Sequence, residues 1–407
     1  MKKLVFVFLL GLVFQIQAQN APKKSQANFE LGSGLTFNFN DSSYIFKLGG
    51  MVQPYIGIEQ ASNNKTDYFL NSKRSYFNFQ GYASAEKVGF FIQLDYSLTA
   101  PLLDAWVGYY PIAGLSIVAG QKQNITNNRE MLFMEDQLQF ANRSLLSNSF
   151  SRSGREMGIF IDYKIGKSIG IVPQISLTSG DGINSFGIDS RDTDLGGFKY
   201  AGRLDVYPLG FFSKSNEKLV ADVMHEPTPK FVLGAAASYN DGASNAVGEG
   251  HGDIILYNQI GSAQYPDYRQ LNGDILLKYQ GFSMLGEYKI STATKLQGSY
   301  KDEFANELLL PTEIADFLSL GSGFNVQLGY VTTSGYALDF RYSEISAEFK
   351  NRITSVIKDQ TQWTVGATKY FKGNNLKINA SFSALNSSSN LTTPDLYLGE
   401  FLFQVRF

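Results

Sequence analysis

Cysteine is absent from this chain, and histidine occurs only twice, as His225 and His251. Without cysteine, disulfides and thiol chemistry are excluded, so stability must come from backbone hydrogen bonds and packing. The sequence also has no G-x-S-x-G motif, no phosphate-binding P-loop and no histidine pair at metal-ligand spacing. Both histidines fall in predicted connections, where neither suits a hydrolase that pairs serine with histidine on a barrel wall. We therefore expect neither an enzyme nor a cofactor or metal site.

Long apolar runs are confined to the start of the chain. After Met1-Lys2-Lys3, an eleven-residue apolar run extends from Leu4 to Phe14 and precedes Ala18. This pattern predicts a secretory signal peptide at 1–18, because the run is too short to cross a membrane as a helix. A membrane anchor is the alternative interpretation. No later stretch reaches 18 consecutive apolar residues, which excludes helical membrane spans elsewhere.

Charge is scarce and nearly balanced, at 18 % of all residues. Of the 35 Lys and Arg residues, removal of Lys2 and Lys3 with the signal leaves 33 against 37 Asp and Glu, a net charge of −4. This balance argues against nucleic acid as a partner. It also supplies no general basic field, so any preference for anions must come from the local placement of Arg and Lys.

Aromatic residues and glycine are abundant, with 32 Phe, 23 Tyr and 39 Gly. The mean hydropathy is only −0.14. A membrane β-barrel has this profile, because lipid-facing and water-facing residues alternate and cancel. Aromatics then supply girdles at the two membrane interfaces, and glycine supplies turns and sheet curvature. A secreted β-sandwich could share the composition, so composition alone leaves both classes open.

The C-terminal eleven residues, 397–407, alternate with a period of two. One face is apolar: Tyr397, Gly399, Phe401, Phe403, Val405 and Phe407. The other face is mostly polar: Leu398, Glu400, Leu402, Gln404 and Arg406. A membrane β-strand requires this pattern. We interpret the final aromatic, Phe407, as a signal for the outer-membrane assembly machinery.

Sixteen segments read as strands after a short N-terminal piece. They lie near 44–60, 73–86, 88–99, 101–110, 114–123, 155–165, 168–179, 197–207, 230–240, 270–280, 282–292, 322–331, 336–347, 361–371, 375–386 and 395–407. The predicted fold class is therefore all-β, a transmembrane antiparallel β-barrel of about 16 strands. The expected organisation is a signal peptide at 1–18, an N-terminal periplasmic segment at 19–43 and the barrel at 44–407.

The predicted connections alternate between long and short, as in bacterial outer-membrane barrels, whereas a sandwich has no reason to alternate them. Long connections lie near 61–72, 124–154, 180–196, 241–269, 293–321, 348–360 and 387–394. Two connections break the rule: 99–101 is short where a long one is due, and 208–229 is long where a short one is due. The connection 124–154 carries apolar clusters that a solvated loop would not need, so we expect it to fold inward as a constriction loop. A loop that caps its neighbours outside the pore is the alternative.

Several stretches carry a family resemblance. They are 104–111, 115–122, 142–146 and 154–158, then 201–204, 276–282 with 286–288, and 364–377. In order and spacing they resemble the phosphate-selective porin O and P family, over about 44–407. The resemblance implies a homotrimeric outer-membrane channel. The chain departs from the family at Met51, where the family typically has Arg, and at 123–125, where the family usually places a Pro-Phe pair. It also lacks a dense arginine ladder, so phosphate selectivity stays open.

A pore selects solutes by charge and width at its narrowest ring. Strand alternation places several basic residues on the lumen face: Arg74, Lys122, Arg203, Lys278 and Arg341. The inward loop and its end add further charges: Arg129, Glu130, Glu135, Asp136, Arg143, Arg152 and Arg155. We expect a mixed-charge constriction that favours polar solutes. For each residue the alternative is an ion pair that anchors the loop, or a charge that keeps the lumen wet.

Three functions fit these observations. The first is an outer-membrane porin for passive diffusion of small hydrophilic solutes, including anions such as phosphate. The second is a carrier of a hydrophobic ligand, which would use the apolar loop residues 131–134 and 304–310. The third is a plugged barrel whose long loops bind partners at the cell surface. An acidic stretch at 181–194 could also bind Ca²⁺ weakly, although such a stretch is more often a solvated loop. The expected location is the outer membrane of a Gram-negative bacterium.

Overall fold

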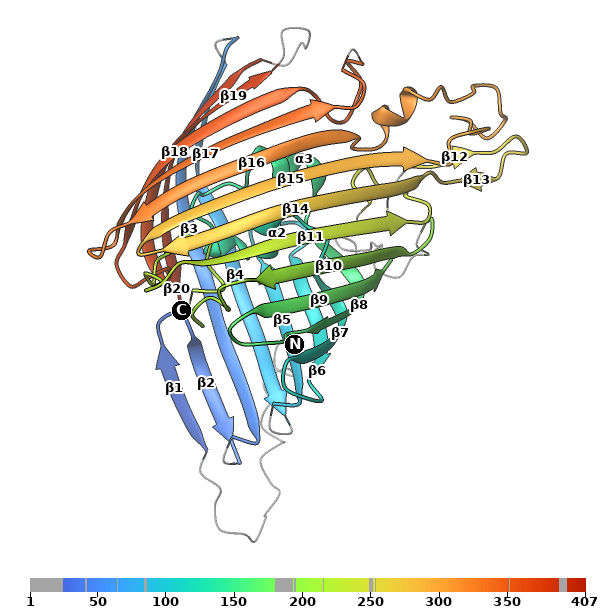
Figure 1. Ribbon diagram of the computed structural model, residues 1–407. Coiled ribbons are helices and arrows are strands. Elements are labelled where there is room, and N and C mark those ends of the chain that lie inside the picture. Colours follow the sequence, from blue (N-terminus) through green and yellow to red (C-terminus); the bar gives the residue numbers. More distant parts are fainter. Residues whose placement is uncertain are drawn as a thin grey trace, which may run out of the picture.

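The computed structural model describes residues 25–407, apart from 41, 64, 84–85, 180–192, 194, 215, 249–251, 253, 351 and 388–393. Within this part, 18 strands form one sheet, and sixteen of them close into an antiparallel barrel (Figure 1). The last strand pairs with the first wall strand and completes the ring. The all-β barrel of sixteen strands is therefore confirmed. The expected signal peptide at 1–18 lies outside the described residues.

Each of the sixteen predicted segments overlaps one wall strand. The wall strands are β3 (Tyr44–Ala61), β4 (Thr66–Ala83), β5 (Val88–Asp95), β6 (Leu102–Tyr109), β7 (Leu115–Gln123), β8 (Arg155–Tyr163), β9 (Gly170–Thr178), β10 (Lys199–Tyr207), β11 (Lys230–Asn240), β14 (Asp267–Tyr279), β15 (Phe282–Thr294), β16 (Gly321–Val331), β17 (Tyr336–Ala347), β18 (Gln360–Tyr370), β19 (Leu376–Ser387) and β20 (Leu396–Arg406). All neighbouring strands in this ring pair antiparallel.

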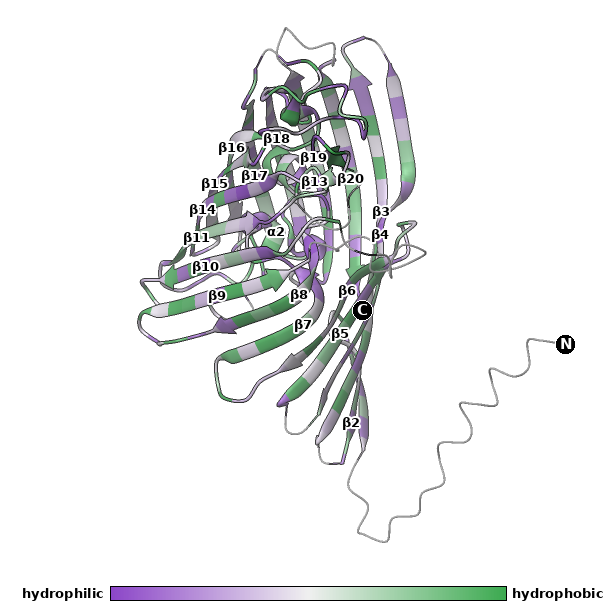
Figure 2. Cartoon of the chain, turned by 90° about the vertical axis from the view of Figure 1, so that its right-hand side faces the viewer, coloured by the Kyte–Doolittle hydropathy of each residue, from purple (hydrophilic) through white to green (hydrophobic). Residues whose placement is uncertain are grey.

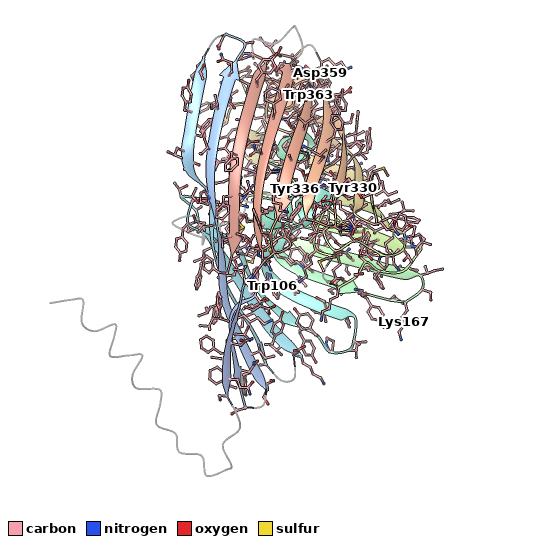
Figure 3. All side chains as sticks on the ribbon, turned by 90° about the vertical axis from the view of Figure 1, so that its left-hand side faces the viewer. Trp106, Lys167, Tyr330, Tyr336, Asp359 and Trp363 are labelled. Atoms are coloured by element: carbon pink, nitrogen blue, oxygen red, sulfur yellow. The ribbon has the colours of Figure 1, made fainter. Side chains whose placement is uncertain are left out.

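Alternation divides most wall strands into an outer apolar face and an inner, mostly polar face. On β17, Leu338 is 73 % exposed, whereas Asp339 and Arg341 are buried inside the barrel. Figure 2 shows the resulting bands of green and purple along the strands. Outer aromatics mark two levels of the wall in Figure 3, with Tyr330 and Tyr336 at one level and Trp363 at the other. Such a surface suits a lipid band between two aromatic girdles.

The wall is uneven in height. Strands β3 and β4 have 18 residues each, whereas β5 and β6 have 8. Strand β5 pairs only with residues 76–83 of β4. The predicted long connection at 61–72 is wrong, because 66–72 pair across to β3 and leave only 62–65 as the turn. The polar residues at both ends of 66–72 resemble a loop, although Tyr68, Phe69 and Leu70 lie between them. Only pairing with β3 makes this segment part of the wall.

A hairpin precedes the barrel wall within 19–43, where the sequence indicated no strand. It consists of β1 (Gln26–Glu30) and β2 (Gly34–Phe39), and β2 pairs with the start of β3. The chain end lies directly beyond β2, since Gly50 and Phe407 exchange two backbone hydrogen bonds of 2.7 and 3.0 Å. The hairpin thus continues the sheet past the end of β20, and Phe37 and Phe39 extend its aromatic outer surface toward Phe46.

The two ends of the barrel differ in their connections. We call the end with most of the short connections and the C-terminus the turn end, and the opposite end the loop end (Figure 1). At the loop end, the small hairpin β12 (Leu256–Tyr257) and β13 (Ala263–Gln264) and the 3₁₀ helix η2 (Glu313–Asp316) lie in two long connections. The long connection 208–229 lies at the turn end, as predicted. No helix in the described part of the chain is long and apolar enough to cross a membrane.

Candidate pore constriction

The connection 124–154, called the inward loop below, enters the barrel and is almost entirely buried there. It contains α2 (Arg129–Leu132), the 3₁₀ helix η1 (Glu135–Gln137) and α3 (Leu145–Phe150). Its apolar residues Leu145, Leu146 and Phe150 pack on the inner wall near Ile345. The predicted inward fold is confirmed, and the alternative of a loop that caps the outside is wrong.

Glu130 holds the two halves of the inward loop together. Its carboxylate accepts hydrogen bonds from the Ser144 backbone N–H at 2.8 Å, the Ser144 hydroxyl at 2.7 Å and the Ser147 hydroxyl at 2.5 Å. Ser144 in turn caps α3, because its Oγ accepts from the Ser147 backbone N–H. The polar residues of this loop therefore bond to one another and make it a compact insert.

A buried cluster of four charges fixes the loop to the wall strands β10 and β14. Arg129 of the loop lies 2.6 Å from Asp205 and 2.5 Å from Asp274. Arg203 of the wall contacts the same two carboxylates at 2.9 and 2.6 Å. The cluster rests on Gly234 of β11, where a Cβ atom would overlap with both arginines and Asp274. Glycine at this position therefore leaves the space that the charges occupy.

A second charged cluster joins the loop to the short wall. Glu135 accepts from Arg143 at 2.9 Å and from Arg155 at 3.1 Å, and Arg155 also contacts Asp104 at 2.9 Å. Tyr76 donates to Glu135 at 2.8 Å. Burial opposes ionisation of Glu135, but the two arginines outweigh it and hold the pKa of its carboxyl well below its usual range.

Opposite the short wall, Arg341 of β17 meets the loop. Its guanidinium contacts Glu130 at 3.3 Å and the Asn142 carbonyl at 2.9 Å, and it lies 4.7 Å from the ring centroid of Phe140. The Phe140 ring sits against Gly366, where a Cβ atom would press into it. The loop is therefore anchored on opposite sides of the lumen.

The remaining predicted basic residues contact different parts of the lumen. Arg74 bonds the Ala141 carbonyl and Gln53, each at 3.0 Å. Lys122 lies on the inner face of β7, 5.2 Å from the ring centroid of Phe160. Lys278 holds a different segment, because it donates to the carbonyls of Asn216 and Leu219 in the 208–229 connection. The role of Arg74, Lys122 and Lys278 in ion selectivity stays a prediction.

One cavity of about 480 Å³ opens between the inward loop and the short wall, and we call it the loop-end cavity. Its basic lining residues are Lys73, Arg74, Arg143, Arg152 and Arg155, and its acidic ones are Asp95 and Glu135. Four of the nine basic residues singled out from the sequence thus gather around one space. Basic charge exceeds acidic charge there, although the whole chain is acidic.

Sequence reasoning singled out the loop carboxylates Glu130 and Glu135 but missed the acidic partners on the wall strands and the glycines. Asp104, Asp205 and Asp274 occupy inner-face positions, so alternation alone could have marked them as lumen residues. Gly234 and Gly366 also lie on inner faces, where glycine breaks an otherwise polar stripe. No signal in the sequence indicates which charges pair, because pairing depends on the register of strands far apart in the chain.

The remaining candidates have no assembled site in the described residues. No group of three or more His, Asp or Glu residues there could hold a metal ion. His225 lies in a turn of the 208–229 connection, and His251 and nearly all of the acidic stretch 181–194 fall outside the described residues. In the segment 304–310, Phe304 and Leu310 are exposed, whereas Leu309 packs in a buried apolar cluster at the loop end.

No protein-family model and no curated protein sequence matches the chain. Solved structures with the same fold do match. An anion-selective porin from Comamonas acidovorans superposes with a TM-score of 0.55 at 10 % identity, covering 89 % of this chain and 100 % of that one. OprB from Pseudomonas putida gives 0.52 at 10 % identity, covering 90 % and 95 %. The trimer form of OmpT, an outer membrane protein of Vibrio cholerae, gives 0.52 at 9 % identity, covering 90 % and 100 %.

The chain therefore has the barrel fold of solved outer-membrane porins. The more specific resemblance to the phosphate-selective porin O and P family has no matching family model and stays a prediction. At about one residue in ten identical, these similarities concern the fold alone.

Proposed function

We propose that the chain is an outer-membrane porin through which small hydrophilic solutes diffuse passively. The observation that carries the proposal is a closed barrel with an apolar outer face, a polar lumen and an inward loop that narrows it. The turn end, with the C-terminus, then faces the periplasm of a Gram-negative cell, and the loop end faces outward. The export signal at 1–18 is part of this proposal. The proposed diffusion of solutes involves no catalytic step.

Within this proposal, the pore prefers anions. Support comes from the loop-end cavity, where five basic residues face two acidic ones in a chain of net negative charge. Fixed charge beside a narrow passage raises the local concentration of the opposite ion. Phosphate is one anion of this class, and the anion-selective porin named above has the same fold.

A plugged barrel with a role at the cell surface is the second candidate. One observation favours it: the inward loop bonds to wall strands on several sides of the lumen, through Arg129 to β10 and β14, Arg341 on β17 and Asn142 to Glu400 on β20. A loop held in this way could fill the cross-section. Conductance separates this candidate from the porin.

The first test is single-channel current in a planar bilayer under a KCl gradient. We expect steady conductance, with a reversal potential displaced toward that of chloride. Neutralisation of Arg74 and Lys122 (R74Q and K122Q) should reduce the displacement, because both face the lumen. Conductance without ion preference would leave a general porin, and the absence of conductance would favour the plugged barrel.

A further inference from the structure

The connection 208–229 folds back into the turn end of the barrel and packs beneath the inward loop. Its residues Phe212 and Val220 share one buried apolar cluster with Phe133 and Leu138 of the loop. This cluster rests on the inner faces of β11, β14 and β15. In the ring of strands, β14 and β15 lie opposite the short wall (Figure 1). The lumen is therefore filled from both ends on the side of β14 and β15.

Two cavities lie on the other side, along the short wall. One is the loop-end cavity, and a second of about 710 Å³, here called the turn-end cavity, lies between the 208–229 connection and the wall. On the inner face of β5, Asp95 lines the loop-end cavity and Phe91 lines the turn-end cavity. Gln93 lies between these two residues on the same face. One side chain of β5 therefore separates the two cavities.

The neighbouring elements pass from one cavity to the other at the same level. On β4, Tyr76 lines the loop-end cavity and Asn78 lines the turn-end cavity, and Asn78 pairs directly with Gln93. On the inward loop, Glu135 lines the loop-end cavity and Met134 the turn-end cavity. The cavities thus meet at a single level of the lumen, which is the level of Gln93.

The Gln93 side chain bridges the short wall and the inward loop at this level. Its amide nitrogen donates to Asn78 Oδ1 at 3.0 Å and approaches the Met134 sulfur at 3.8 Å. Its amide oxygen accepts from Arg155 at 3.4 Å. These partners line both cavities, and Gln93 itself is only 1 % exposed. In this position the side chain closes the route between the two cavities.

The bonds that hold Gln93 in place are easily exchanged. A thioether sulfur is a weak acceptor, and 3.4 Å is long for a hydrogen bond to an amide oxygen. Arg155 keeps Asp104 and Glu135 as partners when the amide moves away. A glutamine side chain has several rotatable bonds, so the amide can turn toward either cavity and bond to water there. The amide is uncharged, so it limits the width of the route without selecting ions by their charge.

We infer that Gln93 is the gate of the pore. Solutes pass between the short wall and the inward loop, from one cavity to the other, when the Gln93 side chain swings aside. This inference rests on the proposed porin and adds the route and the residue that sets its size limit. Ion preference arises in the charged cavities on either side of the gate.

The first test is single-channel current through the full mature barrel with the variants Q93A and Q93M. We expect Q93A to raise conductance about twofold and to leave the reversal potential under a KCl gradient unchanged, because the gate carries no charge. Q93M keeps a side chain of similar length without the amide, so its conductance should stay near that of the unmodified chain. The matched control is Q270A, which removes a buried glutamine on the inner face of β14, opposite the short wall. It should leave conductance unchanged.

The absence of cysteine from the chain permits a direct test of the route. Q93C supplies a single thiol, and a charged methanethiosulfonate reagent should react with it from either side of the bilayer. The attached group then narrows the route and lowers the current. The control Q270C places the thiol on β14, where the same reagent should leave the current unaltered.

Unchanged conductance in Q93A, a Q93M channel as wide as Q93A, or unaltered current in Q93C after the reagent would each overturn the gate. Current through the unmodified chain would leave the porin standing in those cases. An unmodified chain that conducts only after the Q93A substitution would contradict passive diffusion and support the gate. Absence of current in both would overturn the gate and the porin together.

Discussion

At the scale of the residue, the lumen is organised by buried charges whose partners come from distant parts of the chain. Arg129 belongs to the inward loop, whereas Asp205 and Asp274 belong to two separate wall strands. Burial of a charge costs free energy unless the charge is paired. Loss of one partner therefore leaves the other charge buried without compensation for its desolvation. Single substitutions in these clusters should therefore act on the whole loop.

Gly234 offers a direct test of this arrangement. In G234A the new methyl group overlaps with Arg129, Arg203 and Asp274, so the four-charge cluster must separate. We expect the free energy of unfolding in lipid vesicles, measured with urea, to fall by about 3 kcal/mol. The control is G273A on the adjacent strand β14, where no atom lies within 4 Å of the added carbon. Equal effects of the two substitutions would contradict the role assigned to Gly234.

The pKa of Glu135 predicts how the loop responds to acid. Its folded-state pKa lies well below the usual 4.5, so its ionised form stabilises the fold above the unfolded pKa. This contribution is lost as the pH falls from about 4.5 through the folded pKa. We expect E135Q to lower stability at pH 7 and to flatten the decline between pH 5 and pH 3. Parallel unfolding curves for both proteins across that range would show that Glu135 contributes nothing.

Alternation in the sequence was sufficient to predict which residues face the lumen, but insufficient to predict their contacts. Arg203, Lys278 and Arg341 all lie on inner faces, as period-two counting requires. Arg203 and Asp274 are 71 positions apart, and only the register of β10, β11 and β14 brings them together. Register is a property of long-range pairing, which local patterns do not encode.

At the scale of the element, detection from sequence depended on how strongly each strand alternates. The sixteen wall strands were found because each has an apolar outer face, which gives its sequence a period of two. Strand β1 and the first part of β4 were missed, since their polar residues resemble loops, and β2 was missed although its Leu35, Phe37 and Phe39 alternate with other residues. The inward fold of 208–229 was also missed, although its buried residues 219–221 form a short apolar run.

The inward loop occupies the lumen, and we propose that it determines the free cross-section. Replacement of 129–150 by a short Gly-Ser linker should raise single-channel conductance several-fold, because sixteen strands enclose a space too wide for wall side chains to fill. A matched deletion of 302–307 removes an exposed loop tip at the loop end and should leave conductance unchanged. Unaltered current after removal of the inward loop would place the narrowest point elsewhere.

At the scale of the whole molecule, the uneven wall bears on assembly. A transmembrane strand needs about 9–11 residues, and β5 and β6 have 8 each. We propose that this low wall is covered by association of three copies, as in the homotrimer that the family resemblance implies. Light scattering in mild detergent should give a trimer for the unmodified chain. The variant V107R adds a charge to the exposed outer face of β6 and should yield monomers.

The control for that experiment is K167E, which alters charge on the turn between β8 and β9, outside the low wall. It should remain trimeric. A monomeric unmodified chain, or a trimer that tolerates V107R, would mean that the low wall is not the contact between copies.

The hairpin β1–β2 has a consequence for closure of the ring. Strand β2 already occupies residues 44–48 of β3, so the final strand can pair only from Gly50 onward. A slip of one residue toward β2 would collide with the hairpin, and it would also turn the apolar face of β20 inward. The hairpin therefore acts as a mechanical stop. It limits the last strand to the one register in which it meets β3 from Gly50 onward.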